Sequence, residues 1–134
     1  MQSGLYSPDI PLVSSELDVS STGDKYSWAV PFKCRVVRFG VATRNDVGAT
    51  GITLLEKRVA DTDTTIATLN WTTAHTAGKF VYVDLATSVE LSEGDILNVN
   101  QSDACAAGDL FQAVVIIRQV PEALGNNSKA VATA

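Results

Sequence analysis

This chain of 134 residues contains one histidine, two cysteines and one methionine, and it has no glycine-rich phosphate-binding loop. The histidine, His75, lies in a predicted hairpin loop without a serine or cysteine motif to act as its nucleophile. Cys34 and Cys105 are far apart, and no second pair completes a zinc or redox motif. The sequence therefore lacks the usual signatures of an enzyme. We therefore expect neither catalysis nor a cofactor.

Long apolar runs and clustered positive charge are also missing. No stretch approaches the roughly 18 apolar residues of a membrane-spanning helix. The first residues lack the basic and apolar regions of a secretory signal. The net charge is −5, and the Lys and Arg residues are scattered instead of forming a patch for phosphates. We expect synthesis in a reducing cytoplasm and no binding to membranes or nucleic acid.

What the sequence does contain is a series of short alternating or apolar segments separated by polar turns, which is typical of β-strands. The spacing of about 10–15 residues is too short for crossover helices. These features predict an all-β fold of about eight strands in a two-sheet antiparallel sandwich, a jelly roll or a related Greek key. The final segment is the most apolar and is predicted to be central and covered on both faces. The predicted strands are Glu16–Ser20, Lys25–Phe32, Lys33–Thr43, Gly51–Arg58, Thr64–Trp71, Lys79–Leu85, Asp95–Gln101 and Leu110–Val120.

The composition divides the chain into an extended N-terminal arm (residues 1–15), a β-sandwich domain (16–120) and a flexible C-terminal tail (121–134). The two prolines of the arm remove backbone donors and disfavour helix. The arm is too apolar for a solvated tail, so we expect it to pack along its own domain or onto a neighbour. Its predicted contact residues are Leu5, Tyr6, Pro8, Ile10, Leu12 and Val13.

Several other residues have two readings. Asp61 and Asp63, Asp103 and Asp109, and the group Glu90, Glu93 and Asp95 do not match the spacing of a Ca²⁺ loop, so we interpret them as turn residues and predict no metal site. Tyr26, Trp28, Trp71 and Tyr82 fit core or subunit packing, but aromatic side chains also stack on sugar rings. Cys34 fits a core position, whereas Cys105 lies in a loop where it can be exposed. Their pairing stays open.

The segment Tyr26–Thr43, with its Val-Pro-Phe-Lys-Cys-Arg-Val order, resembles the capsid decoration (cement) proteins of tailed bacteriophages. The similarity continues through the Thr-rich segment Asp61–Thr73, the segment Val89–Leu97 with its Glu-Gly-Asp turn, and the closing strand Phe111–Arg118. The resemblance implies a homo-oligomer, a dimer or trimer, that binds the major capsid protein on the outer surface of the virion. It also implies that the protein is made in the host cytoplasm and stabilises the shell by bridging neighbouring subunits. The apolar arm would then make the capsid or subunit contact.

Two alternatives remain open. One is a carbohydrate- or host-surface-binding sandwich, such as a head fibre or a lectin-like domain, for which an exposed aromatic platform is required and Trp71 is the candidate. The other is a small hydrolase on a jelly-roll scaffold, which requires a pocket with perturbed acids.

Overall fold

The computed structural model confirms the all-β prediction. It describes residues 8–44, 50–71, 78–105 and 110–121, with the backbone alone for residues 86–88. No helix in this part of the chain is long and apolar enough to cross a membrane. The strands are β1 (Asp9–Asp18), β2 (Gly23–Ala29), β3 (Cys34–Thr43), β4 (Ile52–Val59), β5 (Thr62–Asn70), β6 (Phe80–Leu91), β7 (Ile96–Asp103) and β8 (Leu110–Gln119).

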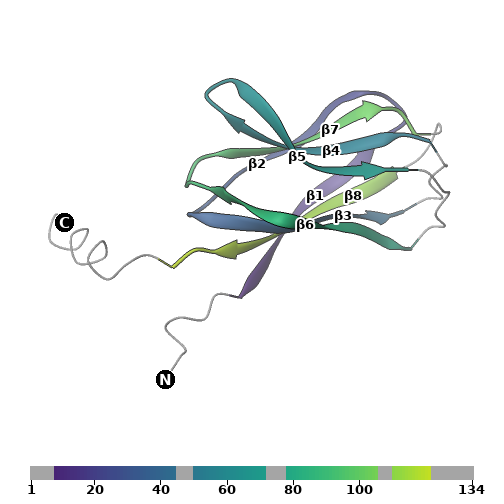
Figure 1. Ribbon diagram of the computed structural model, residues 1–134. Coiled ribbons are helices and arrows are strands. Elements are labelled where there is room, and N and C mark those ends of the chain that lie inside the picture. The colour runs from purple at the N-terminus through teal and green to yellow at the C-terminus, as the bar shows by residue number, and fades with distance from the viewer. Residues whose placement is uncertain (1–7, 45–49, 72–77, 106–109, 122–134) are drawn as a thin grey trace, which may run out of the picture.

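The strands form two four-stranded sheets packed face to face (Figure 1). The first sheet has the order β1-β8-β3-β6 and the second the order β2-β7-β4-β5, and every pairing between neighbours is antiparallel. Each sheet thus alternates early and late strands of the chain, which is the strand order of a jelly roll. The more specific of the two predicted topologies is therefore confirmed.

The core lies between the sheets and consists of the inward side chains of both. Residues that alternate along β8 illustrate the pattern: Phe111, Ala113, Val115 and Ile117 are fully buried. Alternation places successive side chains on opposite faces, so the residues between them point outward. The inward residues that are completely buried also include Val36, Phe39, Val41, Leu55, Leu97 and Val99.

A small polar network crosses this core beneath the second sheet. The Trp71 indole Nε1 donates to Thr53 Oγ1 at 3.0 Å, and the Thr53 hydroxyl donates to Gln101 Oε1 at 2.6 Å. The Gln101 amide donates to the carbonyl of Asp103 at 2.8 Å. Because each buried polar group has a partner, burial of these side chains carries no large desolvation penalty.

The N-terminal arm has a different boundary from the predicted one. Residues 9–15 form the first part of β1, which pairs with β8 from Asp9 to Asp18. Residues 9–15 therefore pack along their own domain, one of the two placements expected for the arm. Pro11 is tolerated because β1 is an edge strand. A bulge between Val13 and Glu16 separates the two halves of the strand.

Candidate binding surface

The outward side chains of the first sheet form an exposed apolar surface, which we call the apolar face. The strand register places Val13, Val114, Gly40 and Tyr82 in one row across all four strands. The neighbouring rows add Pro11 and Ile116 on one side and Ala42 and Phe80 on the other. Val13, Phe80 and Tyr82 keep 46%, 44% and 47% of their surface exposed.

The most prominent part of the apolar face is an aromatic pair on β6. The rings of Phe80 and Tyr82 are stacked, with centroids 5.4 Å apart and an interplanar angle of 26°. Gly40 on β3 makes room for them, because a Cβ at this position would lie 2.8 Å from Phe80 and from Tyr82. The guanidinium of Arg38 lies 3.9 Å from the centroid of the Tyr82 ring, a cation–π contact. The pair is thus held in place before any partner binds.

Ion pairs border the apolar face. Arg38 Nε donates to Asp84 Oδ1 at 2.6 Å, and this hydrogen bond raises the pKa of Arg38. Arg118 makes two hydrogen bonds to Asp9, at 2.7 and 3.2 Å, and they lower the pKa of that carboxyl from its ordinary value of 3.8. The two pairs flank a shallow hollow that is also lined by Val37 and Ile116. An apolar centre with a polar rim is the usual anatomy of a protein–protein interface.

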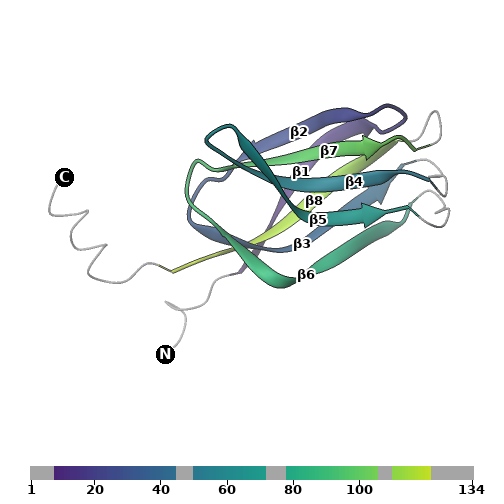
Figure 2. The ribbon, with the colours of Figure 1, turned by 45° about the horizontal axis from the view of Figure 1, so that its top comes forward.

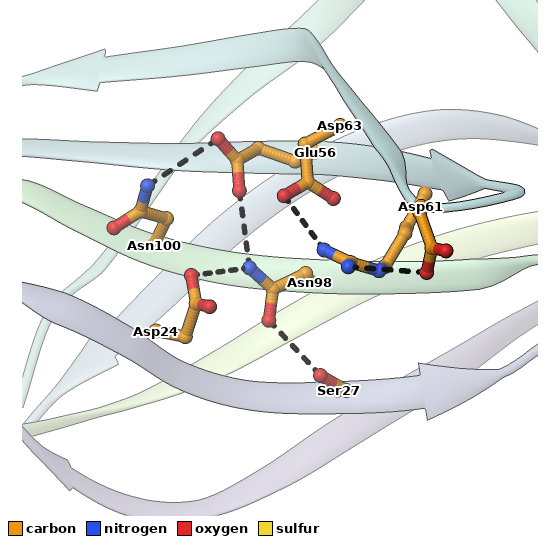
Figure 3. Close-up of polar contacts among 8 residues, drawn as sticks. Asp24, Ser27, Glu56, Asp61, Asp63, Asn98 and Asn100 are labelled. Atoms are coloured by element: carbon orange, nitrogen blue, oxygen red, sulfur yellow. Dashed lines mark hydrogen bonds and ion pairs between the residues drawn. The ribbon is translucent and has the colours of Figure 1, made fainter.

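The outer face of the second sheet is polar, and its groups bind one another (Figure 3). Asn98 Nδ2 donates to Asp24 Oδ1 at 2.8 Å and to Glu56 Oε1 at 3.0 Å, while its carbonyl oxygen accepts from Ser27 at 2.9 Å. Asn100 donates to the second oxygen of Glu56 at 3.3 Å. Glu56 and Asn98 are only 8% and 5% exposed. This network leaves few groups free for a partner.

The predicted contact residues of the arm separate in the structure. Leu5 and Tyr6 lie outside the described residues. Pro8 is exposed, Val13 belongs to the apolar face, and Ile10 and Leu12 are partly buried against the core. The second half of the arm is therefore an edge strand of the first sheet and part of the fold.

The structure confirms core packing for Trp71, contradicts its alternative role in sugar binding, and corrects one prediction about the final strand. Trp71 is 2% exposed and stacks on Phe111 in the core, so it offers no platform to a sugar. The final strand is central, as predicted, but its outward residues Val114 and Ile116 are only half-buried and nothing among the described residues covers that side. The apolar composition of β8 therefore reflects the apolar face as well as the core.

The other candidate residues have varied positions. Tyr26 and Trp28 form an edge-to-face pair, with centroids 5.1 Å apart, that packs against the core. Cys34 is buried as predicted, and burial raises the pKa of its thiol. Cys105 is also buried, which corrects the expectation that it can be exposed. Its sulfur accepts a hydrogen bond from the Gln101 amide at 3.4 Å, and no disulfide joins it to Cys34.

The acidic candidates form no metal site among the described residues. Asp61 occupies the β4–β5 turn with a φ of 68° and lies 3.6 Å from Arg58, in agreement with its interpretation as a turn residue. Asp63 is the second residue of β5 and pairs with the same Arg58 at 2.9 Å. His75 and Asp109 lie outside the described residues.

Phe80 was not among the aromatic residues singled out from the sequence. The signal that could have identified it is the alternation Phe80-Tyr82-Asp84 against Val81-Val83-Leu85. Val81, Val83 and Leu85 are aliphatic and are expected to face the core. Phe80 and Tyr82 must then lie on the solvent side together with the charged Asp84, because successive side chains of a strand alternate between its faces. Comparison with models of known protein families gave no match, and neither did comparison with curated proteins.

Proposed function

We propose that this protein is a structural component of a phage virion that binds the outer surface of the capsid and stabilises it by bridging neighbouring major capsid subunits. The observation that carries the proposal is the apolar face: Val13, Val114, Ile116, Phe80 and Tyr82 form one surface across four strands. Exposed apolar patches with a polar rim mark protein interaction sites. The resemblance of residues 26–118 to decoration proteins supplies the class of partner.

The mechanism we propose is multivalent. Each copy makes a modest contact through its apolar face, and contacts to more than one capsid subunit raise the effective affinity steeply. Tyr82 and Arg38 are of the residue types that dominate binding energy at interfaces. Their fixed geometry reduces the entropy lost on binding. Residues 1–7, with Leu5 and Tyr6, remain a candidate second contact.

The experiment is quantitative mass spectrometry of purified virus particles, scaled to the major capsid protein. The proposal predicts a copy number comparable to that of the capsid subunit. A handful of copies would contradict a decoration role and favour a fibre or tail component. Absence from the particle would overturn the proposal.

The second candidate is carbohydrate binding, and one specific observation favours it. Phe80 and Tyr82 are stacked and exposed, and the Arg38–Asp84 pair beside them offers hydrogen-bonding groups to sugar hydroxyls. On this hypothesis Phe80→Ala abolishes binding on a glycan array, whereas an array without any signal for the wild-type protein rejects it. Trp71→Ala is not a valid test, because Trp71 is a core residue.

A further inference from the structure

The free edge of β6 differs from the other three sheet edges of the sandwich. An unpaired strand edge invites pairing with another chain, and proteins usually block it with proline, lysine or a bulge. β1 contains Pro11 and a bulge between Val13 and Glu16. β2 has Lys25 and a register shift between Asp24 and Tyr26. On β5 an extra residue, Ile66, interrupts the pairing with β4.

No such device protects the first half of β6. From Phe80 to Asp84 its pairing with β3 is regular, and the segment Phe80–Leu85 contains neither proline, lysine nor glycine. Its residues are mostly aromatic or β-branched, which favours strand pairing. Among the described residues no strand pairs with β6 on the side away from β3. Figure 2 shows β6 at the lower margin of the sandwich.

A cleft of 760 Å³ lies on the flank of the sandwich beside β6, between the β4–β5 hairpin and β6, and its walls include Ile66, Leu85 and Val89. β5 and β6 also contact each other across this flank, as β1 and β2 do on the opposite one. In the plane of the sheet, β6 has no neighbour beyond β3 among the described residues, so another strand can pair with its edge.

We propose that two copies of this chain associate through antiparallel pairing of their β6 strands. Pairing about a two-fold axis at Tyr82 sets Tyr82 opposite its counterpart, Phe80 opposite Asp84, and Val81 opposite Val83. Apolar side chains then meet on the inner side, the aromatic pairs meet on the outer side, and no like charges face each other. Cross-strand pairs of this kind stabilise antiparallel sheets.

This self-complementarity favours a second copy over an unrelated strand as the occupant. A two-fold interface brings the same patch of both subunits together, and β6 supplies matching residues to both sides. The pairing would also set the rings of Phe80 and Tyr82 beside those of the second copy, and it would join the two apolar faces into one surface. The evidence for this dimer is the unprotected edge of β6, so the dimer can form whether or not the protein binds a capsid.

The test is native mass spectrometry and light scattering of the full chain. We expect a mass twice the 14.2 kDa of the chain. Tyr82→Lys and Tyr82→Glu should each yield monomers, because each places like charges opposite one another at the two-fold axis. A mixture of the two variants should restore a dimer that contains one copy of each. Tyr82 is half-exposed, so circular dichroism should show both variants folded.

Val13→Lys is the matched control, because Val13 is equally exposed on the same face but lies on the opposite edge strand. It should leave the dimer intact. A wild-type protein that is monomeric at every concentration tested would overturn the proposal. A dimer that survives Tyr82→Lys and dissociates with Val13→Lys would also overturn it, in favour of packing between apolar faces.

Discussion

The outer faces of the two sheets are built on the same scaffold but have opposite chemistry. On the second sheet, Asp24, Ser27, Asn98 and Glu56 bind one another, and the two residues at the centre of the network are almost completely buried. On the first sheet, the central outward positions are apolar, and Val13, Phe80 and Tyr82 are half-exposed. Polar groups that bind one another need no partner, whereas an exposed apolar surface gains free energy when a partner covers it. This difference is why we propose the first sheet as the binding surface.

The largest difference in stability should be found between a variant that lacks a core aromatic side chain and one that lacks a surface aromatic side chain. Trp71→Ala should lower the free energy of unfolding by about 3–5 kcal/mol, because it leaves a cavity and removes a buried hydrogen bond. Phe80→Ala on the apolar face should cost only about 1 kcal/mol, within the usual range for a partly exposed site. Urea denaturation of both variants measures the difference. Equal losses would contradict the view that the Phe80 ring is available to a partner.

The sequence predicted the fold well and the binding surface poorly. Alternation and turn residues placed six of the eight predicted strands within a few residues of the observed ones. The exceptions are the first, which begins at Asp9 and not at Glu16, and the sixth, which ends at Leu91 and not at Leu85. The first error arose because Pro8 and Pro11 were read as arm residues, although an edge strand tolerates proline. The last residues of β6 were also missed, since the alternation breaks down after Leu85.

The residues of the apolar face are brought together by the pairing register of four strands, and this register cannot be deduced from a single sequence. Val13, Val114 and Tyr82 are about 30 or more residues apart along the chain, and only the pairing of four strands brings them into one row. The polar network has the same origin, because Asn98 reaches Asp24 on β2 and Glu56 on β4 across two strand pairs. Alternation alone could have placed Phe80 and Tyr82 outside, but it could not show that Tyr82 lies in the same row as Val13 on the opposite edge strand.

The polar face can be tested through its buried acid. Glu56→Ala removes the acceptor for both Asn98 and Asn100, and it should destabilise the protein by about 1–3 kcal/mol. The matched change on the first sheet is Asp84→Ala, which breaks an exposed ion pair and should cost less than about 1 kcal/mol. Thermal unfolding of both variants gives the comparison. A larger loss for Asp84→Ala would show that the Arg38–Asp84 ion pair stabilises the fold more than the polar network does.

Gly40→Ala should disturb the apolar face with a moderate effect on stability. The added Cβ would lie 2.8 Å from atoms of Phe80 and Tyr82, so the aromatic pair must shift. We expect a loss of about 1–3 kcal/mol, the usual range for overpacking, because the Phe80 ring can rotate away but Tyr82 Cβ is fixed to the backbone. Near-ultraviolet circular dichroism should report the displaced rings. An unchanged spectrum and stability would contradict the conclusion that the absence of a side chain at Gly40 makes room for the aromatic pair.

The smallest effect concerns the ion pair at the rim. Arg118 lowers the pKa of Asp9, so the pair stabilises the folded state above pH 3.8, and this contribution is lost as the pH falls through the lower folded-state pKa. The stability difference between wild type and Arg118→Gln should therefore be greatest near neutral pH and shrink below pH 3.8. Because both groups are half-exposed, added salt should reduce it. A difference that grows with acidity would contradict this assignment.

The most direct test of the account compares one added carboxylate on each outer face. Val13→Asp introduces it into the apolar face, and Thr68→Asp introduces it at an exposed outward position of the second sheet. Both variants should fold, and on the proposed function both can be titrated onto phage heads that lack the protein. We predict that Val13→Asp weakens binding at least tenfold and that Thr68→Asp binds like the wild type. Unchanged binding of Val13→Asp, together with loss for Thr68→Asp, would contradict the assignment of the binding surface to the first sheet.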